Sequence, residues 1–406
     1  MLAHRSVSCR ASARTSRKPY VSITATAAAQ STAQIRIGTR GSKLAKLQAQ
    51  QVQGLLRRVR PEWTEGHFEL LEYATHGDKD KTEQLRTLGQ GAFTEVIDQA
   101  VADGSVDIGV HSLKDQPVKL PPGVQLAACL PRDDPRDAFI SIKYACTADL
   151  PAGARVGTSS LRRKAQLLHA HPHLRVVPVR GNIDARLQML ESGELDAIVL
   201  AAAGLSRLGQ SGLVTRVLGF DEMLPAACQG AIGISCRTRD PFLRWELGLI
   251  CHEPTWLEIA AERAMLRHLL TPEESSETEE EQQSQSEQSS PGSSTDSPAQ
   301  PGKLSIPLSS SSSSGSRAPP SSAPTLQGIS SITGLPLLPS FAIACHAAFD
   351  PHDGLLRIDG LVASEDGRTM HRVALSGGAA AAEDAEDIGR QLGLQLREFA
   401  LQHGWV

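Results

Sequence analysis

The sequence predicts an α/β protein in which two units with mostly parallel sheets enclose a cleft, followed by a small α+β domain with an antiparallel sheet. Short apolar strands alternate with amphipathic helices from Ile35 onward, and such alternation requires crossover connections between parallel strands. The alternation begins again after PRDDPRDAF, which indicates a second unit. Three strand-like runs and one final helix end the chain and indicate the α+β domain.

The first unit opens with the run IRIGT, which predicts a strand. The following SKLAKLQAQQVQGLLRRV predicts a helix because its apolar residues recur at helical spacing. HFELLEYAT is typical of the next strand. FTEVIDQAVADG predicts a helix that ends at Gly104, and VDIGVHS predicts a strand that leads into a polar loop.

In the second unit we expect strands at ARVGTS, LRVVPV and LDAIVLAAAGL, and helices at LRRKAQLLHA and NIDARLQMLESG. The C-terminal domain is expected to hold strands at LLPSFAIACHAAF, LLRIDGLVAS and MHRVALSG, and a helix at AEDIGRQLGLQLREFALQHG. Residues 271–333 are acidic and then Ser/Pro-rich. They carry too little apolar surface to offset the entropy of ordering, which predicts a disordered insertion.

Arginines cluster where two predicted strands lead into helices. VGTSSLRRKAQLL contains Arg162 and Arg163, and VPVRGNIDARL contains Arg180 and Arg186. Helix N-termini favour negative charge, and guanidinium groups donate in the planar geometry that carboxylates and phosphates accept. Because ligands of open α/β sheets bind at the carboxyl ends of strands, we expect an anion site here. A solvated helix face with scattered arginines is the alternative interpretation.

The loop HSLKDQP follows the strand VDIGV and presents Ser112, Lys114 and Asp115 at the edge of the sheet. A carboxylate beside cationic groups in a cleft can stabilise a cationic intermediate or move a proton. Taken alone, Asp115 is equally consistent with a turn residue before Pro117. With the arginine loops expected across the cleft, the sequence favours a site that binds a polyanion while Asp115 serves cationic chemistry.

Composition limits the function classes. A net charge of −4 argues against a nucleic-acid-binding protein with a basic surface, and no apolar run approaches the ~18 residues of a membrane span. Seven cysteines without a CxxC pair indicate a reducing compartment, and the short histidine row LLHAHPHL has no acidic or Cys partner nearby, so no metal site is expected. Residues 1–33 lack Asp and Glu, which predicts a transit peptide to the plastid stroma, with the mitochondrion as the alternative.

Nine motifs resemble, in order, those of the porphobilinogen deaminase (hydroxymethylbilane synthase) family. They are TRGSKLA, GQGAFTEVID, VDIGVHSLKDQPV, PRDDPRDAFIS, VGTSSLRRKAQL, VRGNIDARL, LDAIVLAAAGLSRLG, LPAACQGAIGISCR and HEPTWLEIAAERAMLRHL. The resemblance implies two periplasmic-binding-protein-like lobes and a third domain. Its expected boundaries are 34–130 with 231–248 for domain 1, 131–230 for domain 2, and 252–270 with 334–406 for domain 3.

The resemblance further implies the head-to-tail condensation of four porphobilinogens, with loss of ammonia, on a dipyrromethane cofactor. Porphobilinogen and linear polypyrrole intermediates would be the partners of a monomeric chain, without nucleic acid or membrane. Asp115 would be the catalytic residue. The residues that the motifs assign to cofactor and substrate carboxylates are Arg40, Ser42, Ser112, Lys114, Thr158, Ser160, Arg162, Arg163, Arg180, Arg186 and Arg207.

The chain departs from the family at the cofactor. In the family, a Gly-Gly-Cys or Gly-Ser-Cys turn soon after AERAMLRHL carries the dipyrromethane, whereas alignment of FAIACHAA places Pro339 there and Cys345 inside a strand, where a buried core residue is expected. Gln90 replaces a cofactor-binding lysine, and Cys228 replaces a glycine. The attachment residue is therefore unknown.

Three explanations of this departure stay open. The chain is a catalytically impaired paralogue that binds pyrrole carboxylates without turnover, an active deaminase whose sequence carries translated intron in place of the cofactor exon, or an enzyme with another thiol. A non-enzymatic binding module is the rival class, and Asp115 argues against it because a pure carboxylate binder needs no acid in its anion site.

Overall fold

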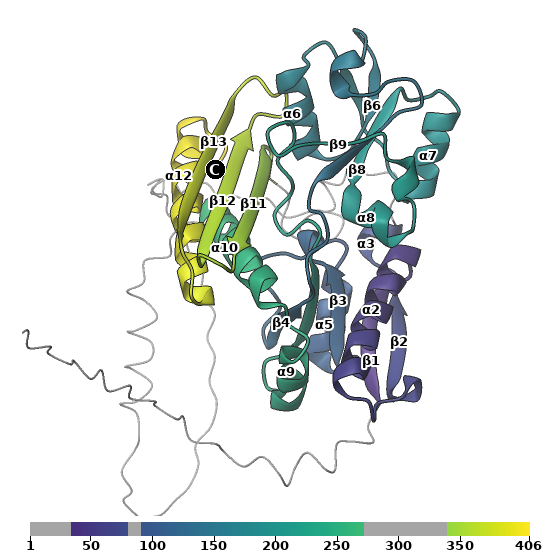
Figure 1. The fold of residues 1–406 in the computed structure, drawn as a ribbon, viewed down its shortest axis with the longest axis vertical. Coiled ribbons are helices and arrows are strands. Elements are labelled where there is room, and N and C mark those ends of the chain that lie inside the picture. Colours follow the sequence, from purple (N-terminus) through teal and green to yellow (C-terminus); the bar gives the residue numbers. More distant parts are fainter. Residues whose placement is uncertain (1–33, 80–90, 272–338) are drawn as a thin grey trace, which may run out of the picture.

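The computed structural model describes residues 34–79, 91–271 and 339–406. The predicted transit peptide, Gln90 and all of the predicted insertion beyond residue 271 lie outside the described residues. Within the described ranges, two five-stranded mixed sheets lie one above the other, and a third, three-stranded antiparallel sheet lies beside them (Figure 1). The predicted α/β fold class is confirmed.

Lobe 1 is built on a sheet with the strand order β2-β1-β3-β10-β4. Strands β1, β2 and β3 are parallel, while β10 is antiparallel to both of its neighbours, so four of the five strands run in one direction. The strands are β1 (Ile35–Arg40), β2 (Phe68–Tyr73), β3 (Ile108–Ser112), β4 (Val124–Cys129) and β10 (Ile232–Arg237). The helices are α2 (Lys43–Val59), η1 (Glu65–His67), α3 (His76–Lys79), α5 (Glu95–Asp103), η2 (Leu113–Asp115) and α9 (Pro241–Gly248).

Lobe 2 repeats this topology with the strand order β7-β6-β8-β5-β9, in which β5 is the antiparallel strand. Its strands are β5 (Asp137–Ile140), β6 (Arg155–Gly157), β7 (Arg175–Val177), β8 (Ala197–Ala201) and β9 (Arg216–Val217). Its helices are η3 (Thr147–Asp149), α6 (Leu161–Ala170), α7 (Ile183–Glu191), α8 (Ala202–Arg207) and η4 (Ser211–Leu213). In each lobe the antiparallel strand directly follows a crossing between the lobes.

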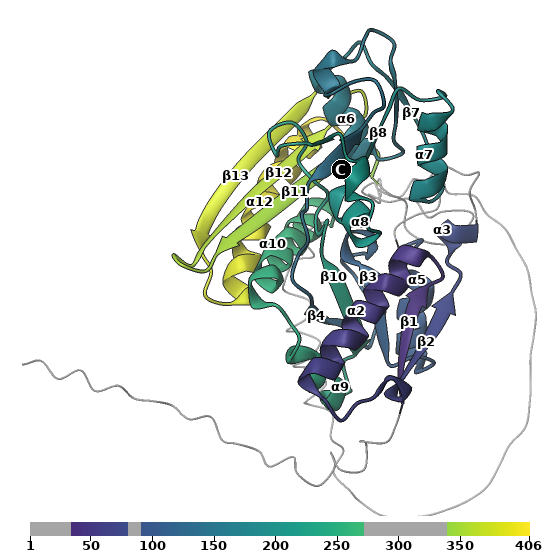
Figure 2. The same cartoon turned by 45° about the vertical axis from the view of Figure 1, so that its right-hand side comes forward.

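The third domain packs two long helices against an antiparallel sheet with the order β11-β12-β13. Figure 2 shows α10 between this sheet and lobe 1. Its elements are α10 (Glu253–Leu270), β11 (Ala342–Asp350), β12 (Leu355–Ala363), β13 (Met370–Gly378) and α12 (Ala382–Gln402). The three predicted strands and the final helix are confirmed, although the helix begins about one turn earlier than expected.

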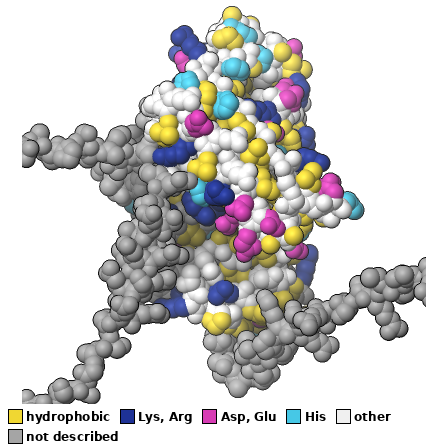
Figure 3. Space-filling view, turned by 90° about the vertical axis from the view of Figure 1, so that its left-hand side faces the viewer, with side chains coloured by type: hydrophobic (Ala, Val, Ile, Leu, Met, Phe, Trp, Pro, Cys, Tyr) yellow, Lys and Arg dark blue, Asp and Glu magenta, His cyan; other side chains and the backbone are white. Residues whose placement is uncertain are grey.

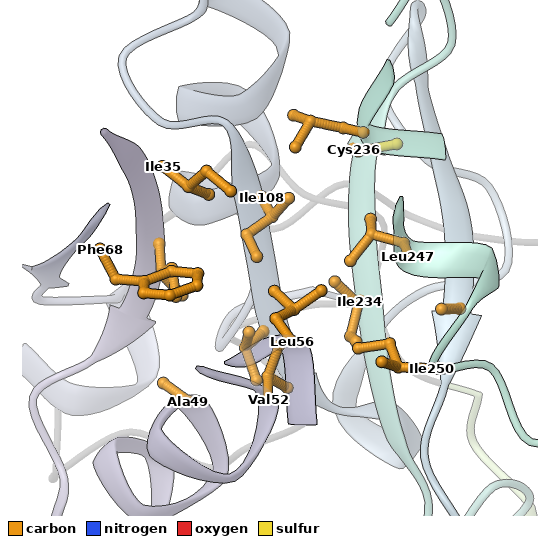
Figure 4. Close-up of a cluster of buried hydrophobic side chains, with 14 of the residues drawn as sticks. Ile35, Ala49, Val52, Leu56, Phe68, Ile108, Ile234, Cys236, Leu247 and Ile250 are labelled. Atoms are coloured by element: carbon orange, nitrogen blue, oxygen red, sulfur yellow. The ribbon is translucent and has the colours of Figure 1, made fainter. Parts of the chain in front are cut away.

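The core of lobe 1 shows why the apolar periodicity predicted these elements. Side chains from β1, β3, β10, α2 and α9 point toward one another in Figure 4. Val52 and Leu56 are four residues apart on α2 and therefore share the face that packs on the sheet. Burial of this kind contributes about 25 cal/mol per Å² of apolar surface.

One predicted element differs from the structure. The run LDAIVLAAAGL was predicted as a single strand, but β8 ends at Ala201 and helix α8 begins at Ala202. The β-branched residues Ile198 and Val199 lie in the strand, and the alanines that follow have the highest helix propensity. The C-terminal end of β8 is thereby turned toward the space between the lobes.

No helix within the described ranges is long and apolar enough to cross a membrane.

Glycines let α12 approach α10 closely. A Cβ added to Gly389 would collide with the backbone of Ala261, whereas a Cβ added to Gly54 of α2 would meet nothing within 4 Å. We therefore expect Gly389→Ala to lower the free energy of unfolding by about 1–3 kcal/mol through overpacking. Gly54→Ala should raise it by about 0.5–1 kcal/mol, because alanine favours the helix. Chemical denaturation of both variants checks this, and equal stability of the two would contradict the packing described.

Candidate functional site

The centre of the site is the 3-10 turn η2, which carries Lys114 and Asp115 at the C-terminal end of β3. The Leu113 N–H donates to the carbonyl of Ala231 at 3.0 Å, which ties the turn to the segment that crosses back from lobe 2. On its other side, the Ser112 hydroxyl and the amide of Gln48 on α2 are 2.8 Å apart. The turn is therefore held by its own lobe and by the crossing segment.

Asp137, the first residue of β5, collects the charges of lobe 2. Its fully buried carboxylate accepts from Arg162 Nη1 at 2.6 Å and from Arg163 Nη2 at 2.7 Å. Burial alone would raise the pKa of this carboxyl, but the two guanidinium groups outweigh it and hold the pKa well below its usual range. Asp137 is therefore ionised at neutral pH.

A single amide links this cluster to lobe 1. Gln229, buried in the crossing before β10, donates from Nε2 to Asp137 Oδ1 at 2.9 Å. Its Oε1 accepts from Lys114 Nζ at 3.2 Å. The two ends of one side chain therefore connect the turn of lobe 1 to the arginine pair of lobe 2. Gln229 therefore lies between the HSLKDQP turn and Asp137, the carboxylate that pairs with the arginines of α6.

The local sequence explains why α6 presents arginines here. Ser160 is the N-cap, and its hydroxyl accepts from the Arg163 N–H at 3.4 Å. The Thr158 hydroxyl accepts from the Ser160 N–H at 3.2 Å and orders the strand-to-helix turn. The first turn of α6 contains no acidic residue, so Asp137 supplies the neutralising charge from another strand.

Further positively charged side chains lie around Asp137, Arg162 and Arg163, and together the positive charges outnumber the negative ones. Burial and repulsion by Arg163 and Arg180 lower the pKa of Arg186 to about 10. Surrounding protein atoms lower the pKa of Lys114 to about 8, and the negative charge of Asp115 offsets this only in part. Part of the Lys114 side chain is nevertheless exposed to solvent. Such mutual repulsion is relieved when an anion binds.

Three predicted residues lie apart from this cluster. Arg40, at the end of β1, pairs with Asp78 and lies 4.4 Å from the centre of the Phe93 ring. Ser42 is exposed and caps α2. Arg207 of α8 pairs with Asp133 at 2.6 Å. Asp133 lies between β4 and β5, in the segment that connects lobe 1 to lobe 2, so this ion pair joins lobe 2 to the connecting segment. The structure thus brings together Lys114, Asp115, Arg162, Arg163, Arg180 and Arg186.

Sequence reasoning missed Asp137 and Gln229. Both lie in motifs, PRDDPRDAFIS and LPAACQG, that were noted only for their resemblance. The sequence around them gives no local signal for their hydrogen-bond partners. Arg162 is 25 residues from Asp137 in the chain, and Lys114 is 115 residues from Gln229.

Of the described thiols, Cys228 adjoins this site, because it precedes Gln229 and packs in one apolar cluster with Leu113 of η2. Cys345 lies in β11, fully buried as predicted, and burial raises its pKa well above the usual value. Cys228 is buried in the hinge, where burial raises its pKa to about 12 and its N–H donates to Glu262. Cys146 follows the end of β5 opposite to Asp137. The other described cysteines are Cys129, Cys236 and Cys251 of lobe 1 and its exit.

The outer surface gives no competing indication of a basic interface on the face seen in Figure 3. There, lysine and arginine side chains are scattered among acidic ones, and acidic side chains gather near the middle of the face.

Comparison with known proteins identifies relatives for the part of the chain that holds this site. A family model described as porphobilinogen deaminase, dipyrromethane cofactor binding domain, matches residues 35–244, just over half of the chain. Chloroplastic porphobilinogen deaminases of Pisum sativum and Oryza sativa are 48% and 47% identical over 241 and 234 residues. These matches cover 59% and 57% of this chain but only 65% of each relative. Porphobilinogen deaminase of Ralstonia nicotianae is 46% identical over 60% of this chain and 72% of its own.

Solved structures of bacterial binding domains are similar at low identity. The VFT2 domain of Bordetella pertussis BvgS is 14% identical with a TM-score of 0.34, covering 54% of this chain and 86% of that domain. An arginine-specific periplasmic binding protein of Salmonella typhimurium is 11% identical with a TM-score of 0.32, covering 54% of this chain and 91% of that protein. Because these TM-scores are below 0.5, the fold assignment rests on the strand orders given above.

Removing the charge of Asp137 should destabilise the fold as well as the site. Asp137→Asn leaves two buried guanidinium groups without their carboxylate, so we expect a loss of about 3–5 kcal/mol in the free energy of unfolding at pH 7. Because the pKa of Asp137 is lowered in the folded protein, its contribution to the free energy of unfolding is present above the ordinary aspartate pKa of about 3.9. This contribution is lost as the pH falls below that value.

Asp134→Asn is the matched control, because that partly exposed ion pair with Arg136 contributes less than about 1 kcal/mol. Urea unfolding at pH 7 and at about pH 3, which is below the ordinary aspartate pKa, measures both variants. A loss at Asp137 no larger than at Asp134 would contradict the central role of this carboxylate.

Proposed function

Because the chain belongs to the porphobilinogen deaminase family, we propose that it joins four porphobilinogens head to tail, with loss of ammonia, to form hydroxymethylbilane for tetrapyrrole synthesis. The observation that carries this proposal is the cation cluster between the lobes, which faces the turn with Asp115. A linear polypyrrole bears two carboxylates on each ring. Several positive groups along one cleft match such a substrate.

The proposed carboxylate binders act in two ways. Lys114 and Arg186 each lie close to Arg163, so a substrate carboxylate that binds beside either of them is stabilised by more than one positive charge. Arg162 and Arg163 already share Asp137, and they shape the wall while their residual positive charge attracts the substrate. We propose supporting contacts from Arg40, Ser42, Ser112, Thr158, Ser160, Arg180 and Arg207, as expected from the motifs.

Asp115 is the proposed catalytic residue. Loss of ammonia from porphobilinogen leaves a cationic pyrrole methylene, and a carboxylate beside it stabilises that charge as it develops. Lys114 on the same turn holds a substrate carboxylate, so one rigid element orients the substrate and stabilises the cation.

The residues fit dipyrromethane in one respect and not in another. The cation cluster suits its carboxylates. However, Cys228, which packs in one apolar cluster with Leu113 of η2, is buried and has a raised pKa, and Cys9 lies outside the described residues. Among the described residues, no accessible thiol therefore lies at the cluster to form the family thioether, and no step of the proposed mechanism is derived through the group. This favours the second candidate function, in which the chain binds pyrrole carboxylates without turnover.

We also propose the domain boundaries given above, a monomeric chain, a location in the plastid stroma, and no nucleic-acid or membrane partner. Net charge, the interspersed charges of Figure 3 and the chloroplastic relatives from two plants support these proposals.

Replacement of Asp115 tests the catalytic assignment. If the wild type consumes porphobilinogen, Asp115→Asn should lower kcat by about 100-fold or more, because it removes the charge that stabilises the cation. Porphobilinogen binding should change by less than about threefold, since the carboxylate binders remain. Turnover close to wild type in the variant would remove Asp115 from the mechanism.

Intact mass spectrometry tests the attachment. We expect the purified protein to have the mass of the bare polypeptide, because its described thiols are buried or lie away from the cluster. Ammonia release with added porphobilinogen then separates an enzyme that binds its primer reversibly from a binder without turnover. A mass increase by two pyrrole units, lost in a Cys228→Ala or Cys345→Ala variant, would contradict the expectation.

A further inference from the structure

A buried carboxylate lies behind the turn that carries Lys114 and Asp115. Asp98, in the first part of α5, is 1% exposed and has three hydrogen-bonding neighbours. Its Oδ1 accepts from the Gln116 amide at 3.0 Å and from the Ser235 hydroxyl at 3.0 Å, and lies 3.1 Å from His111 Nε2. All four side chains are buried, so water does not compete for these bonds.

The neighbours of Asp98 flank the turn on both sides. His111 is the penultimate residue of β3, and Gln116 directly follows Asp115. One carboxylate therefore holds the entry and the exit of a segment of four residues. Ser235 on β10 links the same oxygen to the neighbouring strand.

The exit is held a second time by the third domain. Arg263 of α10 donates from Nη2 to the carbonyls of Pro117 and Val118 at 2.9 and 3.1 Å. Gly91 and Pro117 also meet closely, since a Cβ on Gly91 would lie 3.2 Å from the proline ring. The segment after Asp115 has little freedom to move away from α5.

The orientation of Gln116 indicates that its bond to Asp98 is favoured over others. Among the described residues, its Oε1 is one of few buried side-chain atoms without a hydrogen-bond partner. A reversed amide would place that oxygen against the carboxylate, which is repulsive. The side chain therefore leaves one buried acceptor unsatisfied and keeps its donor on Asp98.

We propose that Asp98 is a positioning residue, which sets Lys114 and Asp115 in the geometry that the reaction requires. This inference rests on the proposed function for the reaction, but the placement of the turn can be measured without it. Asp98 touches neither substrate nor reacting atoms and acts through His111 and Gln116.

The experiment compares Asp98→Asn with Asp107→Asn in the full chain. Asp107 is a matched control in the same lobe, because its carboxylate holds Arg36 and Arg237 at the opposite end of β3. Two readouts are used. The first is the pH dependence of Lys114 acylation by an amine-reactive acylating reagent, mapped by peptide mass spectrometry, and the second is kcat and KM for porphobilinogen. Lys114 faces Asp115 on its own turn and Asp137, Arg162 and Arg163 of lobe 2.

In Asp98→Asn we expect the acylation midpoint of Lys114 to rise from about 8 toward the ordinary lysine value of about 10.4, because a loosened turn moves the amine away from the surrounding protein atoms and from Arg162 and Arg163, which lower its pKa. We expect kcat to fall about 10- to 100-fold with KM changed by less than about threefold. Asp107→Asn should change neither. Gln116→Met, which removes both the donor and the unsatisfied oxygen, should show the same direction and keeps the test open if Asp98→Asn does not fold.

An unchanged Lys114 midpoint in Asp98→Asn and in Gln116→Met overturns the proposal, whether or not the wild type turns over. An unchanged kcat in an active protein overturns it as well. A shifted midpoint in a protein that never consumes porphobilinogen would instead uphold the positioning role and refute the proposed reaction.

Discussion

The buried carboxylate of Asp137 organises the space between the lobes. Without it, Arg162 and Arg163 would be two buried like charges on adjacent residues, an arrangement that a folded core does not tolerate. With it, the arginines are held in place, and Gln229 extends the same network to Lys114 on the other lobe. The single negative charge of Asp137 offsets only part of the positive charge of Arg162 and Arg163, so the cluster keeps a net positive charge that can bind an anion.

The repeated strand order explains why this network lies at the lobe junction. In each lobe the antiparallel strand, β5 or β10, begins directly after the chain has crossed from the other lobe. Asp137 and Gln229 therefore sit at, or just before, the beginning of these two strands. Residues that enter a sheet at a crossing are close to both lobes, whereas residues within the strands serve the cores.

The sequence predicted most elements because their apolar residues recur at regular spacing, as in α2 and β8. It also predicted the arginine-bearing turns, since Gly, Ser and Asn before a helix are local signals. It could not predict that Asp137 pairs with those arginines, or that Asp98 holds the turn after β3, because only folding brings these residues together. Nor does any local pattern show that Lys114 and Gln229, 115 residues apart, share a hydrogen bond. The end of β8 was misplaced because alanine fits the apolar pattern of a strand and the propensity of a helix equally well.

We propose that positive charge makes the main contribution to holding a pyrrole polycarboxylate between the lobes. Calorimetric titration of porphobilinogen at increasing NaCl concentration, and at pH values on both sides of 8, tests this most directly. We expect the affinity to fall with salt, through screening, and to fall again as pH rises through about 8 and Lys114 loses its proton. An affinity that is independent of both salt and pH would contradict the account.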